Sequence, residues 1–369
     1  MALLSLEEKV AVQVLVKFFR KGNMARCLRD ILPSTSLSRE QRENVATLVH
    51  DIVRWRKLYE YVIEQRGCAP LPEVYVSLAL EKVQTAASSY PFDIRYSCSS
   101  YVSKILTDHE PWAEYLNQTP PTTLCVNMNT SDNSTVKTLL LKDQLPAEPS
   151  ILETAILTSS NGKYSTAVQE RYAHVQDENS QLISSLACSF GDRILDYCAG
   201  NGGKSLAMAS MSQNRKNLHA YEVNPARRET LRKRCSEYQA KVTIEDTTPK
   251  KVFDVVLVDA PCTGIGAARR NPEVKYTEHP GDFPQMQLRI LTEAAEHVDT
   301  KGVLIYTVCT ITPEETNDVV EQFITQNRLT FSSERIHVYG EYLKRTKHGS
   351  FTVIPNGDLF FISVLQKKH

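Results

Sequence analysis

Apolar residues recur at helical spacing near the start of the chain. Ser5 and Glu8 have the spacing of an N-terminal capping box, which predicts that a helix begins there. Ser38 and Gln41 repeat this spacing and predict a second helix start. Apolar residues follow each start at helical intervals: Val10, Val14, Leu15 and Phe18, then Val45, Leu48, Val49, Ile52 and Val53. This pattern predicts a small helical bundle.

Changes in the pattern divide the chain into four predicted parts. The helical bundle covers residues 1–68, and a less regular helical linker follows over 69–115. Short apolar runs after Pro120 predict a small mixed α/β subdomain over 116–185. Over 186–369, strand-like and helical segments alternate, which is typical of βαβ units on a mostly parallel sheet. The strands expected in this last part are 193–197, 218–223, 242–245, 253–258, 303–307 and 360–365.

The charge composition leaves nucleic-acid binding open. Lys and Arg number 43, as do Asp and Glu, so the net charge favours neither binding nor exclusion of nucleic acid. Basic residues cluster locally at 54–57, 227–234, 269–270 and 344–347, mostly as expected solvated faces, with one or two candidates for phosphate contacts.

Cysteine usage and hydropathy indicate the setting. The nine cysteines include no C-x-x-C pair, so we expect no metal site and a reduced, intracellular, cytoplasmic location. No apolar run is long enough for a membrane span.

A glycine-rich turn follows the first strand of the α/β part, from Cys198 to Lys204, with the sequence CAGNGGK. Glycines let the backbone turn sharply and approach a ligand, and a helix N-terminus follows. Cys198 stands where a phosphate-binding loop requires glycine, so that loop is excluded. Glu222, at the end of the next strand, lies where a ribose-binding acid belongs. A dinucleotide and S-adenosylmethionine both suit this arrangement.

Two later strands end in cysteines. One ends in Asp259, Pro261 and Cys262, and the other ends in Cys309. Because ligands bind beyond the carboxyl ends of strands in open α/β sheets, these residues should face the same crevice as the glycine-rich turn.

Methylation of carbon 5 of cytosine would require such groups. A thiolate must add to carbon 6, an acid must stabilise the ring at N3, and the carbon-5 hydrogen must leave. Asp259 and the two thiols match these needs, and Lys204 would lower the pKa of the attacking thiol. A single cysteine at a strand end is more often a buried apolar residue, and Asp259 alone could simply end a strand. The combination with the glycine-rich turn favours chemistry, with both cysteines as candidates.

These segments resemble motifs of one family, the Sun/Nol/Nop-type (RsmB-like) RNA cytosine-5 methyltransferases. The matching stretches are 259–266 with the RRNP of 269–272, YTVCT at 306–310 with PEE at 313–315, VQDENSQ at 175–181, and Pro355 with DLFF at 358–361. The resemblance implies a Rossmann-like class I methyltransferase fold with S-adenosylmethionine as cofactor. In the helical part, LVHDIVRWRK at 48–57 is similar to the NusB-like RNA-binding domain of the bacterial ribosomal branch.

The resemblance also implies roles. Cys309 would be the nucleophile and Cys262 would assist product release, with Asp259 and Lys204 completing the catalytic group. The implied cofactor contacts are Cys198, Ala199, Gly200, Asn201, Gly202, Gly203, Lys204, Glu222, Arg227, Asp246 and Asp259.

The chain departs from the family pattern at three places. The turn usually reads CAAPGGK, Val308 replaces a hydroxyl residue, and Leu359 replaces a glycine. None of these changes removes a catalytic group, and Gly200 with Asn201 suits a turn at least as well.

The expected function is therefore formation of 5-methylcytosine in ribosomal RNA by a monomer. Transfer RNA is the alternative substrate, and the target base must be unpaired or flipped out. A catalytically silent RNA-binding assembly factor on the same fold remains a competing hypothesis. A NAD-dependent enzyme is weaker, because no residue suggests a hydride-transfer site.

Overall fold

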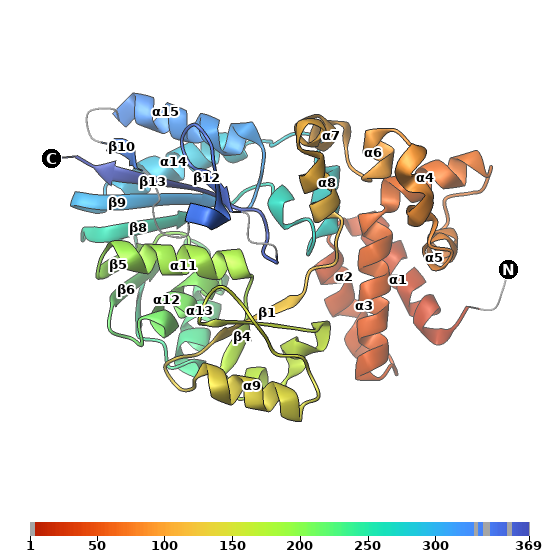
Figure 1. Ribbon diagram of the computed structural model, residues 1–369, viewed down its shortest axis with the longest axis horizontal. Helices are drawn as coiled ribbons and strands as arrows, with labels where there is room; N and C mark the ends of the chain where they lie inside the picture. The colour runs from red at the N-terminus through yellow and green to blue at the C-terminus, as the bar shows by residue number, and fades with distance from the viewer. Residues whose placement is uncertain (1–3, 328–330, 335–339, 353–355, 369) are drawn as a thin grey trace. The chain divides into compact units, whose positions relative to one another are not determined.

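The computed structural model describes residues 4–327, 331–334, 340–352 and 356–368, which fold as two compact units. The first is the chain up to Thr119 together with the returning segment Ala267–His279; the second is Pro120–Gly266 together with the chain from Pro280 onward. Figure 1 shows the helical and sheet-containing parts of the chain. The division into four parts at residues 68, 115 and 185 stays a prediction.

The first unit consists of helices, as predicted. They are α1 (Leu6–Lys21), α2 (Met24–Ile31), α3 (Arg39–Arg54), α4 (Arg56–Gln65), α5 (Pro72–Leu80), α6 (Phe92–Arg95), α7 (Ser100–Leu106) and α8 (Glu110–Leu116). Both predicted capping boxes are confirmed, at Ser5 with Glu8 and at Ser38 with Gln41. The apolar faces of these helices form one core, which includes Val14, Leu15, Val49, Ile52 and Tyr59.

The returning segment is built into this helical core. Lys275, in the short 3-10 helix Pro272–Tyr276, is 1% exposed and donates to the carbonyl oxygens of Arg54 at 2.8 Å and Tyr96 at 3.0 Å. Arg269 is also buried, with its guanidinium 4.3 Å from the centre of the Tyr115 ring. Arg54 donates to the Arg269 carbonyl oxygen at 2.8 Å. Arg54 and Arg269 are therefore internal. The expectation that the basic clusters at 54–57 and 269–270 are solvated is wrong for these two residues.

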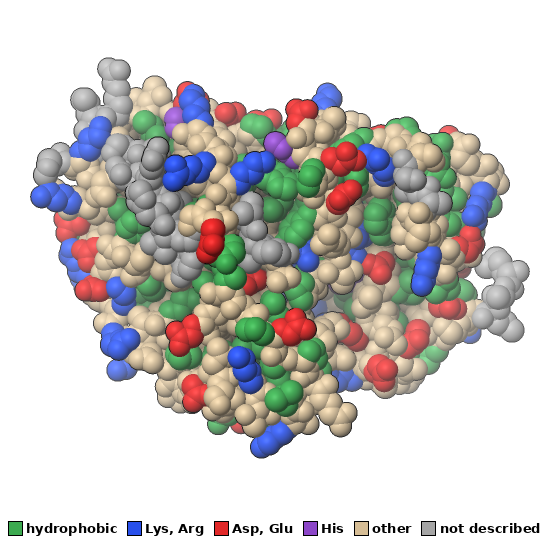
Figure 2. All heavy atoms as spheres, viewed as in Figure 1, with side chains coloured by type: hydrophobic (Ala, Val, Ile, Leu, Met, Phe, Trp, Pro, Cys, Tyr) green, Lys and Arg blue, Asp and Glu red, His purple; other side chains and the backbone are tan. Residues whose placement is uncertain are grey.

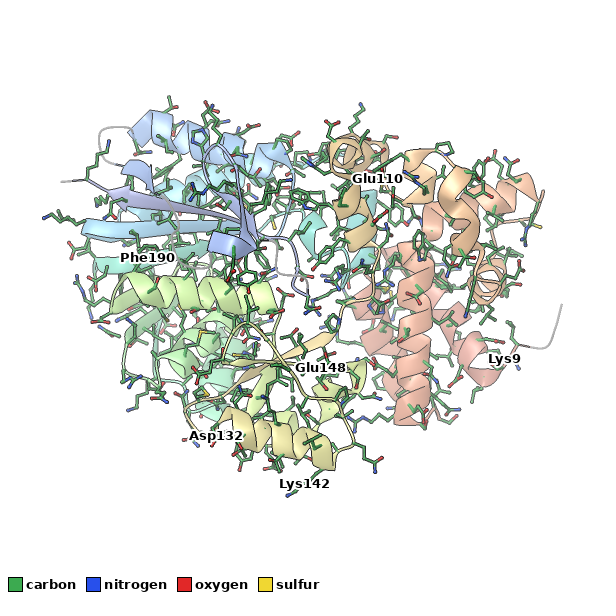
Figure 3. All side chains as sticks on the ribbon, viewed as in Figure 1. Lys9, Glu110, Asp132, Lys142, Glu148 and Phe190 are labelled. Atoms are coloured by element: carbon green, nitrogen blue, oxygen red, sulfur yellow. The ribbon has the colours of Figure 1, made fainter. Side chains whose placement is uncertain are left out.

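The second unit contains a small antiparallel sheet, which confirms the predicted mixed α/β subdomain. Its strands are β1 (Thr122–Val126), β2 (Glu148–Pro149), β3 (Ala155–Thr158) and β4 (Ala173–Val175), in the order β2-β3-β1-β4. Helices α9 (Asn133–Lys142) and α10 (Thr166–Gln169) accompany it. Asp132 caps α9 by accepting a hydrogen bond from the Thr135 N–H at 2.7 Å, and Lys142 lies at the other end of that helix (Figure 3).

The larger sheet confirms the predicted α/β domain. Its strands are β5 (Arg193–Asp196), β6 (Asn217–Tyr221), β7 (Val242–Glu245), β8 (Phe253–Asp259), β9 (Val298–Val308), β10 (Phe331–Glu334), β11 (Leu343–Arg345), β12 (Ser350–Thr352) and β13 (Phe361–Lys367). The order is β11-β12-β13-β9-β8-β5-β6-β7, and β10 pairs with β13. The run from β7 to β9 is parallel, whereas β13 joins β9 in the antiparallel direction. All the predicted strands are present, whereas β10, β11 and β12 were not predicted.

Helices cover this sheet on both faces (Figure 1). They are α11 (Glu178–Phe190), α12 (Gly203–Met211), α13 (Pro225–Glu237), α14 (Phe283–Ala295) and α15 (Asn317–Asn327). Helix α11 packs against α12, and α14 packs against α15. The 3-10 helix Pro313–Glu315 precedes α15. Apolar residues of β5, β8 and β9, such as Ile194, Leu257 and Ile305, form the core under the helices.

The surface carries both signs of charge. Figure 2 shows Lys and Arg side chains interspersed with Asp and Glu over the face in view, as their equal numbers in the sequence suggest. Among the helices of the described residues, none is long and apolar enough to cross a membrane.

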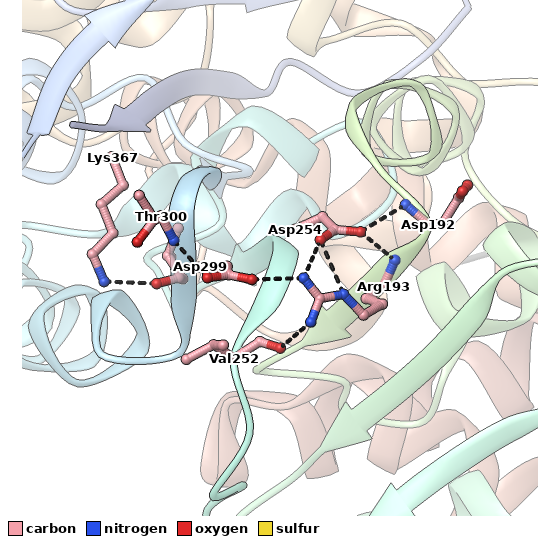
Figure 4. A network of polar contacts seen from close by, with 8 residues as sticks. Asp192, Arg193, Val252, Asp254, Asp299, Thr300 and Lys367 are labelled. Carbon is pink, nitrogen blue, oxygen red and sulfur yellow. Dashed lines mark hydrogen bonds and ion pairs between the residues drawn. The ribbon is translucent and has the colours of Figure 1, made fainter. Parts of the chain in front are cut away.

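One ion network connects the strands β5, β8 and β9 near their amino ends, opposite the ends at which the cysteines lie (Figure 4). Arg193 donates to Asp254 Oδ1 at 2.5 Å and to Asp299 Oδ2 at 2.6 Å, and Asp254 Oδ2 accepts the backbone N–H of Arg193 at 2.9 Å. Although burial raises the pKa of Asp254, these hydrogen bonds outweigh burial and lower it below its ordinary value.

Asp254→Asn should therefore lower the free energy of unfolding by about 1–2 kcal/mol at pH 7, a modest amount because the pair is partly solvated. The folded-state pKa is depressed, so this contribution is present above the unfolded-state value of about 4 and is lost as the pH falls through the folded pKa. Urea unfolding at pH 7 and at successively lower pH should show the difference shrinking. Asp192→Asn, at an 86% exposed side chain, is the control. A pH-independent difference would contradict this account.

Candidate active site

The glycine-rich turn joins β5 to α12 at the carboxyl edge of the sheet. Gly200 and Gly202 have φ angles of 55° and 85°, a conformation that residues with a Cβ rarely adopt. A Cβ at Gly202 would lie 2.3 Å from Leu231 Cδ1, whereas the Cβ position at Gly200 has no neighbour within 4 Å among the described residues. The turn therefore requires Gly202 for packing and leaves space for a ligand beside Gly200.

Glu222 follows β6 and holds this turn in place. Its Oε2 accepts a hydrogen bond from the Gly200 N–H at 2.9 Å, and its Oε1 accepts one from the Asn224 N–H at 2.7 Å. Each oxygen has a further lone pair, so the carboxylate can still accept hydrogen bonds from the hydroxyl groups of a ribose. Val223, the next residue, is 76% exposed and offers an apolar surface beside the turn. Val223 was not predicted to be a site residue, and its position directly after the acid was the available signal in the sequence.

Asp196 is a second acid at the turn, and it was not among the predicted site residues. It ends β5, is 1% exposed, and accepts a hydrogen bond from Ser205 Oγ at 2.6 Å. Burial raises the pKa of Asp196 to about 6. Its buried Oδ1 has no hydrogen-bond partner among the described residues, which suits it to accept a hydrogen bond from a ligand. An acid directly before the turn was the signal in the sequence.

The other residues predicted to contact a cofactor fall into two groups. Cys198, Ala199, Asn201 and Gly203 belong to the same turn as the two glycines. Arg227 lies exposed in the first turn of α13, and Asp246 follows β7 and forms an ion pair with Arg232 at 2.5 Å. The roles of all these residues stay predictions.

Lys204, which is buried, forms an ion pair with the partly exposed Asp259. Lys204 lies in the first turn of α12, Asp259 ends β8, and Lys204 Nζ lies 2.5 Å from Asp259 Oδ2. Burial lowers the pKa of Lys204, but the interaction with Asp259 outweighs burial and raises it. Lys204 therefore stays protonated, and its Nζ also lies 5.0 Å from the centre of the Phe360 ring.

The two predicted cysteines lie side by side. Cys262 Sγ and Cys309 Sγ are 3.4 Å apart, although 47 residues separate them in the chain. The hydrogen bond with Cys262, together with burial, raises the pKa of the Cys309 thiol well above its ordinary value. Lys204 lowers this pKa, as expected from the sequence, but its effect is smaller. Cys309 is therefore a protonated thiol that must lose its proton before it can attack.

Backbone contacts connect the cysteines to two other motifs. The Gly266 N–H donates to the Cys309 carbonyl oxygen at 2.9 Å, and the Leu359 N–H donates to the Gly266 carbonyl oxygen at 3.0 Å. The Asp358 N–H in turn donates to Asp177 Oδ2 at 2.9 Å. Leu359, which stands where the family has glycine, thus makes a backbone contact with the Cys262 motif. Pro355, the other residue quoted from this closing motif, lies outside the described residues.

No group of three or more ligating side chains suited to a metal ion occurs within the described ranges. All nine cysteines lie in those ranges, and all are free thiols.

Comparison with known proteins places the chain in a family. The model of the family described as 16S rRNA methyltransferase RsmB/F matches residues 183–366, which include the turn, Glu222, Asp259 and both cysteines. This chain belongs to the RsmB/F family. The predicted family membership is thereby confirmed.

Individual relatives are distant. The probable ribosomal RNA small subunit methyltransferase B of Bacillus subtilis is 29% identical over 228 residues, covering 56% of this chain and 50% of that protein. The ribosomal RNA small subunit methyltransferase B of Thermus thermophilus is 35% identical over 144 residues, covering 37% of this chain and 35% of that protein. The chain spans about half the length of the first of these RsmB/F relatives and about a third of the second.

Solved structures share the fold. The crystal structure of PH0851 has a TM-score of 0.81 at 19% identity, covering 99% of this chain and all of that one. NSun6 from Pyrococcus horikoshii, solved with SFG, has a TM-score of 0.60 at 14% identity, covering 78% of this chain and 98% of that one. At such identities these likenesses show the fold alone, and they confirm the predicted α/β methyltransferase architecture.

Because Cys262 is the largest cause of the raised pKa of Cys309, Cys262→Ala should lower that pKa. Alkylation of Cys309 by iodoacetamide, which requires the thiolate, should then rise at lower pH than in the unmodified protein. Mass spectrometry of the Cys309 peptide across a pH series measures this shift. The peptide containing Cys188, whose pKa burial raises to about 11, is the internal control. An unchanged Cys309 profile would show that Cys262 does not set this pKa.

Proposed function

We propose that this protein methylates carbon 5 of a cytosine in 16S ribosomal RNA, using S-adenosylmethionine as methyl donor. The single observation that carries the proposal is the pair of thiols 3.4 Å apart, beside the Lys204–Asp259 ion pair. Two thiols suit a reaction in which one sulfur bonds to carbon 6 and a second group assists elimination. Membership in the RsmB/F family supports this chemistry and the ribosomal substrate.

Residues beside the turn suit the proposed cofactor. Glu222 offers carboxylate oxygens for ribose hydroxyls, Val223 an exposed apolar surface for the adenine ring, and Asp196 a buried oxygen for the ammonium group. When bound there, S-adenosylmethionine supplies the methyl group that cytosine carbon 5 receives.

The protein's own groups would carry the remaining steps. The proton of Cys309 passes to N3 of the base as the sulfur adds to carbon 6. The Asp259 carboxylate accepts a hydrogen bond from this N3–H, and Lys204 keeps Asp259 in place. After methyl transfer, the carbon-5 hydrogen is lost as a proton that passes finally to solvent, and its electron pair restores the double bond. The Cys309 sulfur leaves carbon 6 as a thiolate and takes back the proton from N3. Cys262, in contact with Cys309, is the group placed to assist this release.

The helical part over residues 1–68 is the proposed RNA-contacting region. Exposed basic side chains occur where α1 ends and along α2: Arg20, Lys21, Arg26 and Arg29. These groups are available for phosphate contacts, unlike the buried Arg54 and Arg269. The expected monomeric state and cytoplasmic location remain part of the proposal.

The division of labour between the thiols is tested with RNA. Cys309→Ala should abolish methyl transfer and any covalent adduct, because the bond to carbon 6 cannot form. Cys262→Ala should instead accumulate a covalent protein–RNA species that migrates slowly on a denaturing gel, because release is impaired. Sequencing the RNA in that species distinguishes ribosomal from transfer RNA. Adducts with Cys309→Ala would reverse the two roles, and no methylated cytosine in any RNA would refute the proposed activity.

Cofactor binding separates an enzyme from a silent RNA-binding scaffold. Glu222→Ala removes both the ribose acceptor and the hydrogen bond to Gly200, so the Kd for S-adenosylmethionine should rise about tenfold or more. Isothermal titration calorimetry measures the change. Glu229→Ala, which removes an exposed carboxylate on α13, should bind as the unmodified protein does. Failure of the unmodified protein to bind would favour the scaffold.

A further inference from the structure

Hydrogen bonding between β8 and β9 ends just before the cysteines. The last contact of this ladder runs from the Ala260 N–H to the Thr307 carbonyl oxygen at 3.0 Å. Cys262 lies two residues beyond Ala260, in an irregular segment, and Cys309 follows the last residue of β9. The sheet alone therefore does not fix the separation of the two sulfurs.

Glu315 lies behind this irregular segment and is fully buried, with 0% exposure. Its Oε2 accepts hydrogen bonds from the Thr263 N–H at 2.9 Å and from Gln287 Nε2 at 2.9 Å. Gln287 Nε2 also donates to the Pro261 carbonyl oxygen at 2.8 Å. The residues on both sides of Cys262 are thus connected to one carboxylate, directly or through one amide.

The same carboxylate holds the chain that follows Cys309. Glu315 Oε1 accepts hydrogen bonds from Thr312 Oγ1 at 2.9 Å, from Thr263 Oγ1 at 2.5 Å and, more weakly, from Thr310 Oγ1 at 3.4 Å. Tyr306 Oη donates to the Glu315 carbonyl oxygen at 2.7 Å, so the backbone of Glu315 is also held by β9. A buried carboxylate is costly unless hydrogen bonds compensate it, and here the donors come from both cysteine segments.

We propose that Glu315 is a positioning residue that sets the distance between the Cys262 and Cys309 thiols. The catalytic meaning of this distance rests on the proposed methyl transfer. Glu315 contacts neither sulfur and acts through Thr263, Gln287 and Thr312.

The chemistry of the donors distinguishes the possible substitutions. The donors to Oε1 are hydroxyl groups, which can rotate and accept instead, whereas the donors to Oε2 are N–H groups, which cannot. A glutamine can place its oxygen toward the N–H groups and its NH₂ toward the hydroxyls, so Glu315→Gln should keep most of the geometry. Glu315→Ala leaves the Thr263 N–H without its acceptor and Gln287 Nε2 with Pro261 alone, so it should let the two segments separate.

The separation of the thiols can be measured without RNA or cofactor. Diamide takes two hydrogens from a pair of close thiols and leaves a disulfide, whose sulfurs lie about 2 Å apart. The rate of Cys262–Cys309 disulfide formation is followed by mass spectrometry. This rate should fall about tenfold or more in Glu315→Ala and stay near the original value in Glu315→Gln. Glu314→Ala, at the neighbouring acid, is the matched control.

Methyl transfer gives the second readout. In Glu315→Ala, kcat should fall about 10–100-fold while the Kd for S-adenosylmethionine stays within about twofold, because Glu315 lies outside the proposed cofactor contacts. Glu315→Gln should restore most of kcat. If Glu315→Ala does not fold, Gln287→Met, which breaks the link to Pro261, should show the same two effects in weaker form.

The outcomes separate the two hypotheses. Disulfide formation in folded Glu315→Ala or Gln287→Met at the original rate would overturn the positioning role. Slower disulfide formation, together with no methylation by the unmodified protein, would support the positioning role and overturn the proposed activity. Loss of both readouts in Glu315→Ala, with recovery of both in Glu315→Gln, is the result expected here.

Discussion

Parallel pairing of β8 with β9 is the constraint on which the candidate site depends. The register places Asp259 opposite Thr307, so both strands end at the same edge of the sheet. Side chains that follow the two strands must then lie close together, which is why thiols 47 residues apart in the chain come within 3.4 Å. The glycine-rich turn follows β5, which pairs with β8, and therefore opens onto the same edge.

Charged groups at this edge are stabilised in different ways. Lys204 and Asp259 neutralise each other at 2.5 Å, whereas Glu315 is held by hydrogen bonds from neutral donors. In the part of the chain that the structure describes, Asp196 has one oxygen with a hydrogen-bond partner and one without, and burial raises its pKa. A charged group whose hydrogen-bond or ion-pair partners are all present keeps its position. A group that lacks one hydrogen-bond partner can bind a ligand in its place. The site thus combines groups held in place by their partners with one group, Asp196, that would gain a hydrogen-bond partner when a ligand binds.

In the helical unit, burial decides whether a basic side chain is available for phosphate contacts. Arg54 and Arg269 belong to clusters that the sequence suggests are solvated, yet both are buried. The segment after the Cys262 motif returns into the helical core, where Lys275 donates to main-chain oxygens and burial lowers its pKa to about 7. Charge in a sequence therefore predicts phosphate contacts only where the side chain remains exposed, as for Arg20 and Arg26.

Local patterns in the sequence determined the helix starts at Ser5 and Ser38, the strands that alternate with helices, and the candidate thiols, because each depends on residues close together in the chain. Tertiary structure alone decided that Cys309 is a protonated thiol against Cys262, that Glu315 connects the segments after β8 and β9, and that residues 267–279 join the helical unit. These features come from contacts between residues far apart in the chain, and burial there changes the pKa and the available partners of each group. No spacing along a single strand or helix reports such contacts.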